Sequence, residues 1–514
     1  MAPTMLSVCY FMTPQSQAAE MSVSTETAVC SARAFVPFRP LTLRGFIAWG
    51  LGAAAALHVA YEFFPPAILL FLFCIYQLAH AATRPHAMYS GWVLGLLIYG
   101  PQLAFFWNIF GFAAVALWLV LATWLSAYLV LQRFALLKLG PQLGAWAAPF
   151  LWTGVEYFRS ELYYLRFSWV NVGYAFSPFP QQAFIPWLGM YGIGFLLMLF
   201  AAHAPFHRTA TRQQKLIWTT ALALAAIAAF LPGSSAEPER FSPKRGNAIG
   251  TQLKIAGVQL EFADERTVVA ELDKLLAKCP DANLFVLSEY TFSGPVPSPV
   301  KSWCATNRKY LIAGGKDYLD ASESEFRNTA FVIDPEGREI FKQAKAVPIQ
   351  FFKDGQPAAE QNVWNSPWGK LGVCVCYDLS YTRVTDELIR QGAQAIVVPT
   401  MDVEDWGERQ HHLHARVAPV RAAEYGVPIF RLCSSGLSQA VNRDGTVQAT
   451  APFPGQGATL EATLEVPERG GLPMDRILVW PCVGISVSLL VWHLLHSFRP
   501  ARHRTHARIS AERR

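Results

Sequence analysis

The stretch Leu371-Gly-Val-Cys-Val-Cys-Tyr-Asp-Leu-Ser-Tyr381 contains the residues on which the prediction of fold and chemistry depends. Residues Leu371 to Val375 are mostly apolar and partly β-branched, which predicts a short buried strand. Cys376 follows this strand, where a thiol can act as a nucleophile while the next backbone N–H faces a developing oxyanion. The alternative is that Cys374 and Cys376 are buried cysteines that pack as small hydrophobic residues. This stretch alone leaves both interpretations open.

A glutamate and a lysine upstream complete a set that is suited to acyl transfer. Leu284-Phe-Val-Leu287 is a predicted buried strand that leads to Glu289, where desolvation would raise the carboxyl pKa toward that of a general base. Lys345 carries a charge that can stabilise an oxyanion. Taken singly, Glu289 fits a solvated carboxylate at a strand end, and Lys345 fits a solvated surface charge. Together with Cys376 they favour acyl transfer through a thioester.

The composition is that of a membrane protein with one polar insert. Of 514 residues, 52% are hydrophobic and 16% are charged, and the apolar residues form blocks long enough to cross a bilayer. The net charge of +6 arises from short loops and the Arg-rich C-terminus, so it does not indicate a nucleic-acid partner. Eight membrane-spanning helices are predicted, at residues 44–60, 64–81, 89–109, 112–132, 142–158, 183–203, 215–232 and 477–497. The loop lysines and arginines fall on one side if both termini are cytoplasmic, which places the insert outside the cytoplasm.

The polar insert alternates predicted strands with amphipathic helices, which indicates a layered α/β domain. The predicted strands are 254–260, 284–287, 310–315, 328–333, 371–375, 395–398 and 429–432, and the predicted helices are 264–279, 382–391 and 408–424. Before the insert, residues 156–174 mix aromatic side chains with charged ones. This segment fits either an interfacial aromatic belt or a surface that contacts lipid headgroups and acyl chains.

The cysteines and histidines do not predict a metal site. The nine cysteines are scattered without a CxxC pair, and we interpret them as free thiols. His411, His412 and His414 lie close together but lack a supporting cysteine or carboxylate at ligand spacing. A solvated or packed helix face is the preferred interpretation of the three histidines.

Taken together, Glu289, Lys345 and Cys376-Tyr-Asp378 are similar to the Glu–Lys–Cys triad of the nitrilase (carbon–nitrogen hydrolase) superfamily. The membrane context narrows this resemblance to the apolipoprotein N-acyltransferase family, over residues 44–497. A Cys-Tyr-Asp tripeptide alone is a weak signal, whereas an ordered set of matching segments within eight predicted spans is a strong one. The further matching segments are Phe167-Ser-Trp169, Gly173-Tyr174, Pro186–Gly194, Arg409–Arg416, Arg421–Glu424 and Arg431–Gly436.

The resemblance implies a polytopic α-helical membrane domain that carries a nitrilase-like four-layer αββα sandwich. It also implies a location in a bacterial inner membrane, with the catalytic domain facing the periplasm. The implied organisation is a cytoplasmic segment (1–43), seven transmembrane helices (44–233), a linker (234–250), the catalytic domain (251–470), a last transmembrane helix (471–498) and a basic cytoplasmic tail (499–514).

The resemblance further implies a two-step reaction. Cys376 would take an acyl chain from a phospholipid as a thioester and pass it to the α-amine of the N-terminal diacylglyceryl-cysteine of an apolipoprotein. Glu289 would be the base and Lys345 the oxyanion stabiliser. The expected supporting residues are Tyr377, Asp378 and Asn328, and the expected substrate contacts are Trp169, Tyr174, Gln350 and Trp406. No metal, cofactor or nucleic acid is expected, and the chain is expected to act as a monomer.

The run Val347-Pro-Ile-Gln-Phe-Phe-Lys-Asp-Gly355 departs from the family's pattern Val-Pro-Phe-Gly-Glu, which ends in a functionally important glutamate. Gln350 or Asp354 could take its place, or the handling of the acceptor could differ. The missing glutamate is the best support for a membrane-bound amidase or hydrolase, in which water replaces the amine. A third hypothesis is a catalytically degenerate relative that is kept as a membrane interaction protein.

The position of the lysine is shifted as well. Counting back from Val347-Pro348 without a gap puts Gln343 where the family's lysine belongs. Lys345 fits the nitrilase pattern Lys-x-x-Pro, so Lys345 is preferred over Lys342.

Overall fold

The computed structural model describes residues 40–205 and 251–497 of the chain. The predicted span at 215–232, the predicted linker and the predicted basic tail lie outside the described residues, as does most of the segment 1–43. The described residues form a helical part (40–205 and 475–497) and an α/β part (251–466).

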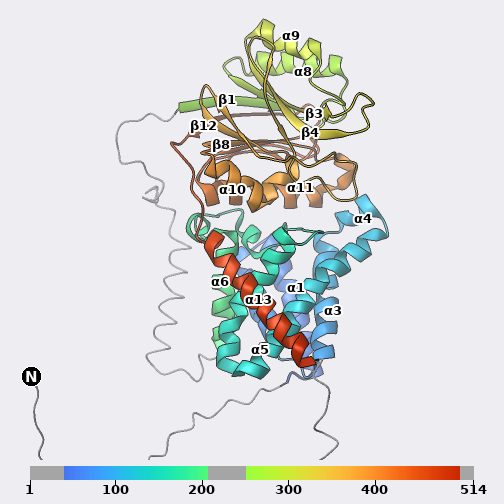
Figure 1. Cartoon of the computed structure of the whole chain (residues 1–514), viewed down its shortest axis with the longest axis vertical. Coiled ribbons are helices and arrows are strands. Elements are labelled where there is room, and N and C mark those ends of the chain that lie inside the picture. The colour runs from blue at the N-terminus through green and yellow to red at the C-terminus, as the bar shows by residue number, and fades with distance from the viewer. Residues whose placement is uncertain (1–39, 206–250, 498–514) are drawn as a thin grey trace, which may run out of the picture. The chain divides into compact units, whose positions relative to one another are not determined.

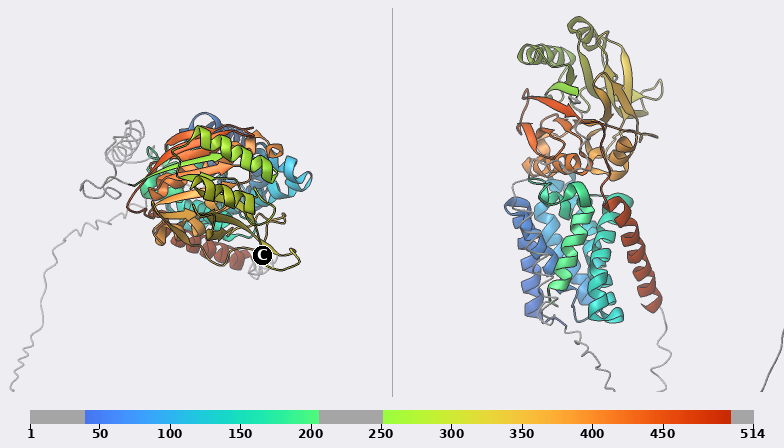
Figure 2. Two further views of the ribbon diagram at one scale, coloured as in Figure 1. Left: turned by 90° about the horizontal axis from the view of Figure 1, so that it is seen from above. Right: turned by 90° about the vertical axis from the view of Figure 1, so that its left-hand side faces the viewer.

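Figure 2 shows most of the helices of the helical part side by side. Its helices are α1 (Leu43–Glu62), α2 (Ile68–Leu78), α3 (Arg84–Gln102), α4 (Phe105–Phe110), α5 (Ala113–Tyr157), α6 (Ile185–His203) and α13 (Asp475–Ser497) (Figure 1). Helix α5 is interrupted at Gly140, whose φ of 81° lies in the left-handed region that favours glycine. Pro141 follows, and this interruption separates the two spans predicted at 112–132 and 142–158.

Seven of the eight predicted spans lie within the described residues, where fewer separate helices have the length and hydropathy of a span. Within the described residues four helices are long and apolar enough to cross a membrane, at Leu43–Glu62, Ala113–Leu162, Ile185–His203 and Asp475–Ser497. The segment predicted at 64–81 is shorter than a span, because α2 has 11 residues where about 20 are needed. Helix α3 contains polar residues such as Arg84 and Gln102, and the apolar stretch Ala113–Leu162 contains both of the spans predicted at 112–132 and 142–158, on either side of Gly140.

The α/β part consists of two six-stranded sheets. One has the order β12-β1-β2-β3-β4-β5, with β1 (Thr251–Val258), β2 (Leu284–Val286), β3 (Tyr310–Tyr318), β4 (Phe326–Ile333), β5 (Glu339–Ala344) and β12 (Thr459–Val466). The other has the order β11-β10-β9-β8-β7-β6, with β6 (Val363–Ser366), β7 (Gly369–Val373), β8 (Ala395–Thr400), β9 (Ile429–Cys433), β10 (Ser438–Val441) and β11 (Val447–Ala451).

The period-2 alternation of the strands produces the layers, since successive side chains point to opposite faces of a sheet. Ala256 and Phe285 pack with Leu272 in the core beneath α8 (Glu265–Lys278) and α9 (Ser298–Asn307). Their neighbours Ile255 and Val286 belong to the other core, which contains the inner strands of the second sheet. Helices α10 (Thr382–Arg390), α11 (Glu408–Ala415) and α12 (Val417–Tyr425) flank that second sheet (Figure 1). The result is the four-layer αββα sandwich that the resemblance implies.

Helices α11 and α12 replace the single helix predicted at 408–424. Pro419 lies in the first turn of α12, and a proline has no N–H to donate to the carbonyl of Ala415. The first helix therefore ends at Ala415.

The candidate site lies next to the carboxyl ends of two strands. Strand β2 is parallel to β3, and β7 is parallel to β8, which is parallel to β9. The carboxyl ends of β2 and β7 lead to Glu289 and Cys376, in the place where open α/β sheets generally bind ligands.

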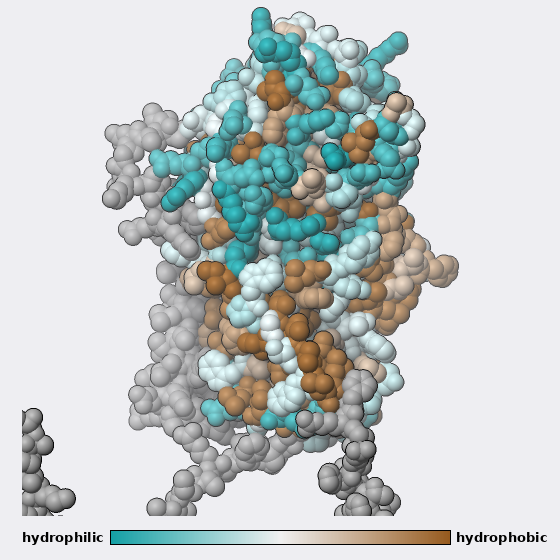
Figure 3. Space-filling view, viewed as in Figure 1, coloured by the Kyte–Doolittle hydropathy of each residue, from teal (hydrophilic) through white to brown (hydrophobic). Residues whose placement is uncertain are grey.

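The surfaces of the two parts differ in hydropathy. On the face seen in Figure 3, apolar side chains cover much of the helical part, whereas the α/β part is largely hydrophilic. Leu43, Leu51, Ile477 and Leu495 are all more than half exposed. Exposed apolar side chains at this density indicate a surface that meets lipid or another apolar partner.

Candidate active site

The turn that follows β7 holds Cys376 in an unusual conformation. Cys376 has a φ of 51° and begins the 3₁₀ turn Cys376–Ser380. A non-glycine residue in the left-handed region costs about 1–3 kcal/mol and persists only when its surroundings impose it. Part of this constraint comes from Asp378, whose carboxylate accepts hydrogen bonds from the backbone N–H groups of Val375, Ala346 and Val347. Asp378 therefore ties the cysteine turn to the lysine loop and is a supporting residue rather than an oxyanion donor.

Lys345 is fully buried between two carboxylates. Its Nζ lies 2.8 Å from Glu289 Oε1 and 2.8 Å from Asp354 Oδ2. Asn328 donates from Nδ2 to both Glu289 Oε1 (2.6 Å) and Asp354 Oδ1 (2.7 Å). By contrast, Lys342 is half-exposed and pairs with Asp317 at 2.7 Å. The structure thus brings Lys345, and not Lys342, to Glu289.

The carboxyl groups of Glu289 and Asp354 have pKa values that are shifted in opposite directions. Burial raises the pKa of Glu289 against the pull of Lys345, and the charge of Asp354 adds to the rise. Burial would also raise the pKa of Asp354, but Lys345 outweighs that effect and lowers it. Burial alone would lower the pKa of Lys345, but Asp354 and Glu289 hold it well above its usual value. Asp354 is therefore the ionised partner of the ammonium, while Glu289 keeps a higher affinity for a proton.

The thiol of Cys376 is protonated in this environment. Burial raises the pKa of Cys376 well above its usual value, and the nearby Glu289 carboxylate raises it further while Lys345 opposes the rise. The Sγ atom is 3.8 Å from the carbonyl oxygen of Met401. The N–H of Met401 donates to Glu289 Oε2 at 2.7 Å, so one backbone unit orients both groups. A thiol held in this way needs a base, and Glu289 has the position and the proton affinity for that role.

Two neighbouring cavities share part of their walls near Glu289 and Lys345. A cavity of about 570 Å³ is lined by Glu289, Lys345 and Tyr290. A second, apolar cavity of about 110 Å³ is lined by Phe105 and Phe110 of α4, by Val120 of α5, and by residues 349–352. Ile349, Phe352 and Trp406 line both cavities. A polar site therefore adjoins an apolar cavity whose walls come largely from the helical part.

Three of the four expected substrate contacts line the apolar cavity, namely Trp169, Gln350 and Trp406. The fourth, Tyr174, is fully buried and lines none of the four cavities described for this part of the chain. Its ring lies 6.0 Å from the Arg421 guanidinium, so we assign Tyr174 to packing instead. Tyr377 also lines the cavity, and its hydroxyl donates to the carbonyl of Arg166 at 3.2 Å.

The histidine cluster divides in the structure. His412 is exposed, whereas His411 and His414 are buried. His414 Nδ1 lies 2.8 Å from Asp402 Oδ1, and the ring stacks on Trp169 with centroids 4.5 Å apart. Atoms of Cys376, Asp402 and His414 lie within 4.8 Å of one another. Arg431 donates to the other Asp402 oxygen, and a guanidinium there opposes a metal cation.

The sequence indicates one further residue of the site only as an alternative, and another not at all. The sequence suggests Asp354 only as one possible substitute for the missing glutamate. Its contact with Lys345 depends on how the loop after Pro348 folds back. The Met401 backbone carries no side-chain signal at all. A position just after the buried strand β8 was the available clue, since β8 lies beside β7.

Family models match both parts of the chain. The family model described as "Apolipoprotein N-acyltransferase N-terminal domain" matches residues 49–203, and "Carbon-nitrogen hydrolase" matches residues 279–470. A protein of Pseudomonas paraeruginosa named apolipoprotein N-acyltransferase is 26% identical over 522 residues, 89% of this chain and 97% of that protein. A protein of the same name from Ralstonia nicotianae is 24% identical over 420 residues, 72% of this chain and 78% of that protein. The crystal structure of Saccharomyces cerevisiae Nit3, of the nitrilase superfamily, matches with 19% identity and a TM-score of 0.37, over 42% of this chain and 91% of that chain.

Proposed function

Because the chain belongs to the apolipoprotein N-acyltransferase family, we propose that it acylates lipoproteins by way of a thioester on Cys376. The acyl donor is a phospholipid, and the acceptor is the α-amine of the N-terminal diacylglyceryl-cysteine of an apolipoprotein. One observation carries the proposal. The cavity lined by Glu289 and Lys345, which both interact with the Cys376 thiol, shares part of its wall with an apolar cavity to which α4 and α5 contribute. A hydrolase of small soluble amides has no need for such a cavity.

In the first step Glu289 takes the proton of Cys376, and the thiolate attacks the carbonyl carbon of a phospholipid ester. The oxyanion that forms is stabilised by the Lys345 ammonium and the backbone N–H of Tyr377. The tetrahedral intermediate collapses with cleavage of the carbon–oxygen ester bond. Glu289 returns the proton to the departing alkoxide, which leaves as the lysophospholipid.

In the second step the amine of the acceptor attacks the thioester carbonyl. Glu289 accepts a proton from the nitrogen, the carbon–sulfur bond breaks, and the amide product leaves. The proton then returns to the thiolate, which restores the starting thiol. Asp354 keeps Lys345 protonated throughout, so the same ammonium serves both oxyanions.

The location follows from the substrates. Both substrates carry acyl chains, and the long apolar helices α1, α5, α6 and α13 are suited to hold the site at a bilayer. We place the protein in a bacterial inner membrane as a multi-pass protein, with the α/β part facing the periplasm. All of the groups used in the two steps come from one chain, so a monomer is sufficient.

Mass spectrometry of the intact chain tests the acyl-enzyme. The purified protein in detergent is incubated with phospholipid, and the site of any added mass is located by peptide mapping. The proposal predicts a gain of one acyl chain on Cys376, loss of the adduct in Cys376→Ala, and retention in Cys374→Ala, which alters the buried neighbour. An adduct on another residue, or none on a folded chain, would contradict the thioester.

A further inference from the structure

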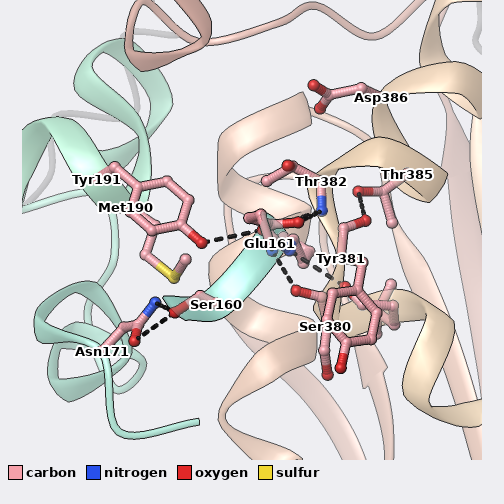
Figure 4. Close-up of polar contacts among 12 residues, drawn as sticks. Ser160, Glu161, Asn171, Met190, Tyr191, Ser380, Tyr381, Thr382, Thr385 and Asp386 are labelled. Carbon is pink, nitrogen blue, oxygen red and sulfur yellow. Dashed lines mark hydrogen bonds and ion pairs between the residues drawn. The ribbon is translucent and has the colours of Figure 1, made fainter. Parts of the chain in front are cut away.

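One carboxylate of the helical part is directed at the turn that carries the nucleophile. Helix α5 leads into the π-helical turn Phe158–Leu162, and Glu161 in that turn is 4% exposed. Figure 4 shows its side chain between Tyr191 on one side and Thr382 on the other. The Tyr191 hydroxyl donates to Glu161 Oε1 at 2.9 Å. The N–H of Thr382 lies 3.3 Å from Oε1 and 3.2 Å from Oε2.

Glu161 acts as the missing cap of α10. Thr382 is the first residue of α10, and Tyr381 at the N-cap position makes no side-chain capping hydrogen bond. The first N–H groups of a helix have no partner within the helix and favour a negative charge. A carboxylate from another part of the chain therefore fixes the start of α10, which follows directly on the turn Cys376–Ser380.

Arg421 contacts the same turn next to Glu161. The guanidinium of Arg421 is fully buried and donates to the carbonyls of Leu379 (3.1 Å) and Ser380 (2.7 Å). It lies 4.0 Å from Glu161 and pairs with Glu424. The carboxylate and the guanidinium therefore hold donors and acceptors at the end of the turn.

Two neighbours of Glu161 in sequence contact this turn as well. Trp169 Nε1 donates to Ser380 Oγ at 2.9 Å. The carbonyl of Arg166 accepts from the hydroxyls of Tyr377 (3.2 Å) and Tyr381 (3.4 Å). The segment 161–169 therefore contacts the cysteine turn at several points, and Glu161 supplies the charged one.

We infer that Glu161 is a positioning residue for the acyl-transfer reaction. By holding the start of α10, it keeps the turn in the conformation in which Cys376, at a φ of 51°, faces Glu289. The inference rests on the proposed function, because it assigns to the helical part a share in the alignment of the nucleophile. Misplacement of a reacting group by about 1 Å can cost about 10²-fold in rate.

The test uses the full chain in detergent with phospholipid as donor. For Glu161→Ala we expect the rate constant of Cys376 acylation at saturating phospholipid to fall about 10–100-fold, with half-saturation changed by less than about twofold. Glu161→Gln keeps an accepting oxygen for the Thr382 N–H and recovers part of the rate. Thr382→Pro removes that N–H at the first helical position, where proline is tolerated, and slows acylation with Glu161 in place. This second variant keeps the test decisive if Glu161→Ala fails to fold.

Glu156→Ala is the matched control. Glu156 is a buried carboxylate of the same helix that accepts from the N–H of Val172 at 3.0 Å. A rate that is unchanged in Glu161→Ala and Thr382→Pro, or that falls equally in Glu156→Ala, would overturn the inference.

Hydrogen–deuterium exchange separates this inference from the proposed function. Faster exchange of the amides of residues 376–390 in Glu161→Ala, but not in Glu156→Ala, is expected whether or not the chain forms a thioester. Unchanged exchange would overturn the positioning role. Absence of the adduct in the unsubstituted chain would count against the proposed function instead.

Discussion

At the scale of single residues, the site depends on two carboxylates that share one ammonium. Lys345 lies 2.8 Å from both Glu289 and Asp354. The like charge of Asp354 raises the pKa of Glu289 after burial has already raised it, although Lys345 opposes both effects. Glu289 thereby keeps its affinity for a proton despite direct contact with the Lys345 ammonium.

Replacing Asp354 tests this division of roles. In Asp354→Asn, Lys345 pairs with Glu289 alone and the repulsion is gone, so the pKa of Glu289 falls. The acidic limb of the pH profile for Cys376 acylation should therefore move to lower pH, with a plateau about tenfold lower because the base is weaker. Asp317→Asn, which removes the partner of the half-exposed Lys342, should leave the profile in place. An acidic limb that stays or moves to higher pH would contradict the assignment.

The two lysines of β5 and its loop can be separated by substitution. Lys345→Met removes the oxyanion partner and leaves two buried carboxylates unpaired, so acylation should fall at least about 100-fold. It should also destabilise the fold by about 3–5 kcal/mol, measured by denaturant unfolding. Lys342→Met should keep near-normal activity, because its ion pair is half-exposed. Equal losses in both variants would argue against Lys345 as the specific oxyanion partner.

At the scale of elements, close approach of two strands sets the position of Glu289. Gly314 of β3 faces the segment after β2, and a Cβ at this glycine would lie 2.5 Å from the Cα of Glu289 and 2.7 Å from the carbonyl oxygen of Ser288. The N–H of Gly314 donates to that same carbonyl at 3.1 Å. Only a residue without a side chain lets β3 approach Glu289 so closely.

Gly314→Ala should therefore displace Glu289. We expect a loss of about 1–3 kcal/mol in stability and a slower acylation step in the folded fraction. Gly294→Ala is the comparison, since a Cβ there meets only the Tyr318 ring edge at 3.4 Å. Thermal unfolding and single-turnover acylation of both variants are the measurements, and normal acylation in a stable Gly314→Ala chain would count against the steric argument.

Helix α5 contributes one wall of the apolar cavity, and the size of that cavity should limit the acyl chain. Val120 lines the cavity, whereas Val115 on the same helix does not line it and is 39% exposed. Val120→Phe should shift the preference toward shorter acyl chains when donors of different chain length compete. Val115→Phe should keep the original preference. The chain-length distribution of the Cys376 adduct, read by mass spectrometry, decides between them.

At the scale of the whole molecule, the sequence predicts the α/β part better than the helical part. Strands such as 284–287 and 371–375 can be predicted because they are short apolar runs. The residues that follow them, Glu289 and Cys376, lie at the site. The spans predicted at 112–132 and 142–158 lie on either side of Gly140, whereas hydropathy alone does not show that α2 is too short to cross a membrane.

Contacts between segments that are distant in the chain could not be predicted from the sequence, for a physical reason. Asp354 reaches Lys345 only because a loop folds back, and Glu161 reaches Thr382 across 221 positions of the chain. Neither pair leaves a periodic pattern, since spacing along the chain predicts only neighbours on one element. Tyr174 illustrates the opposite case. The sequence suggests it as a substrate contact, but its side chain is fully buried.

The most direct test of the central claim follows the acyl chain from donor to acceptor. The chain is loaded with a phospholipid whose acyl group is isotopically labelled, freed of excess donor, and then mixed with a diacylated lipopeptide that has a free α-amine. The proposed function predicts that the labelled acyl group leaves Cys376 and appears as an amide on the peptide nitrogen. Labelled free fatty acid with an unmodified peptide would contradict it and would identify the chain as a hydrolase.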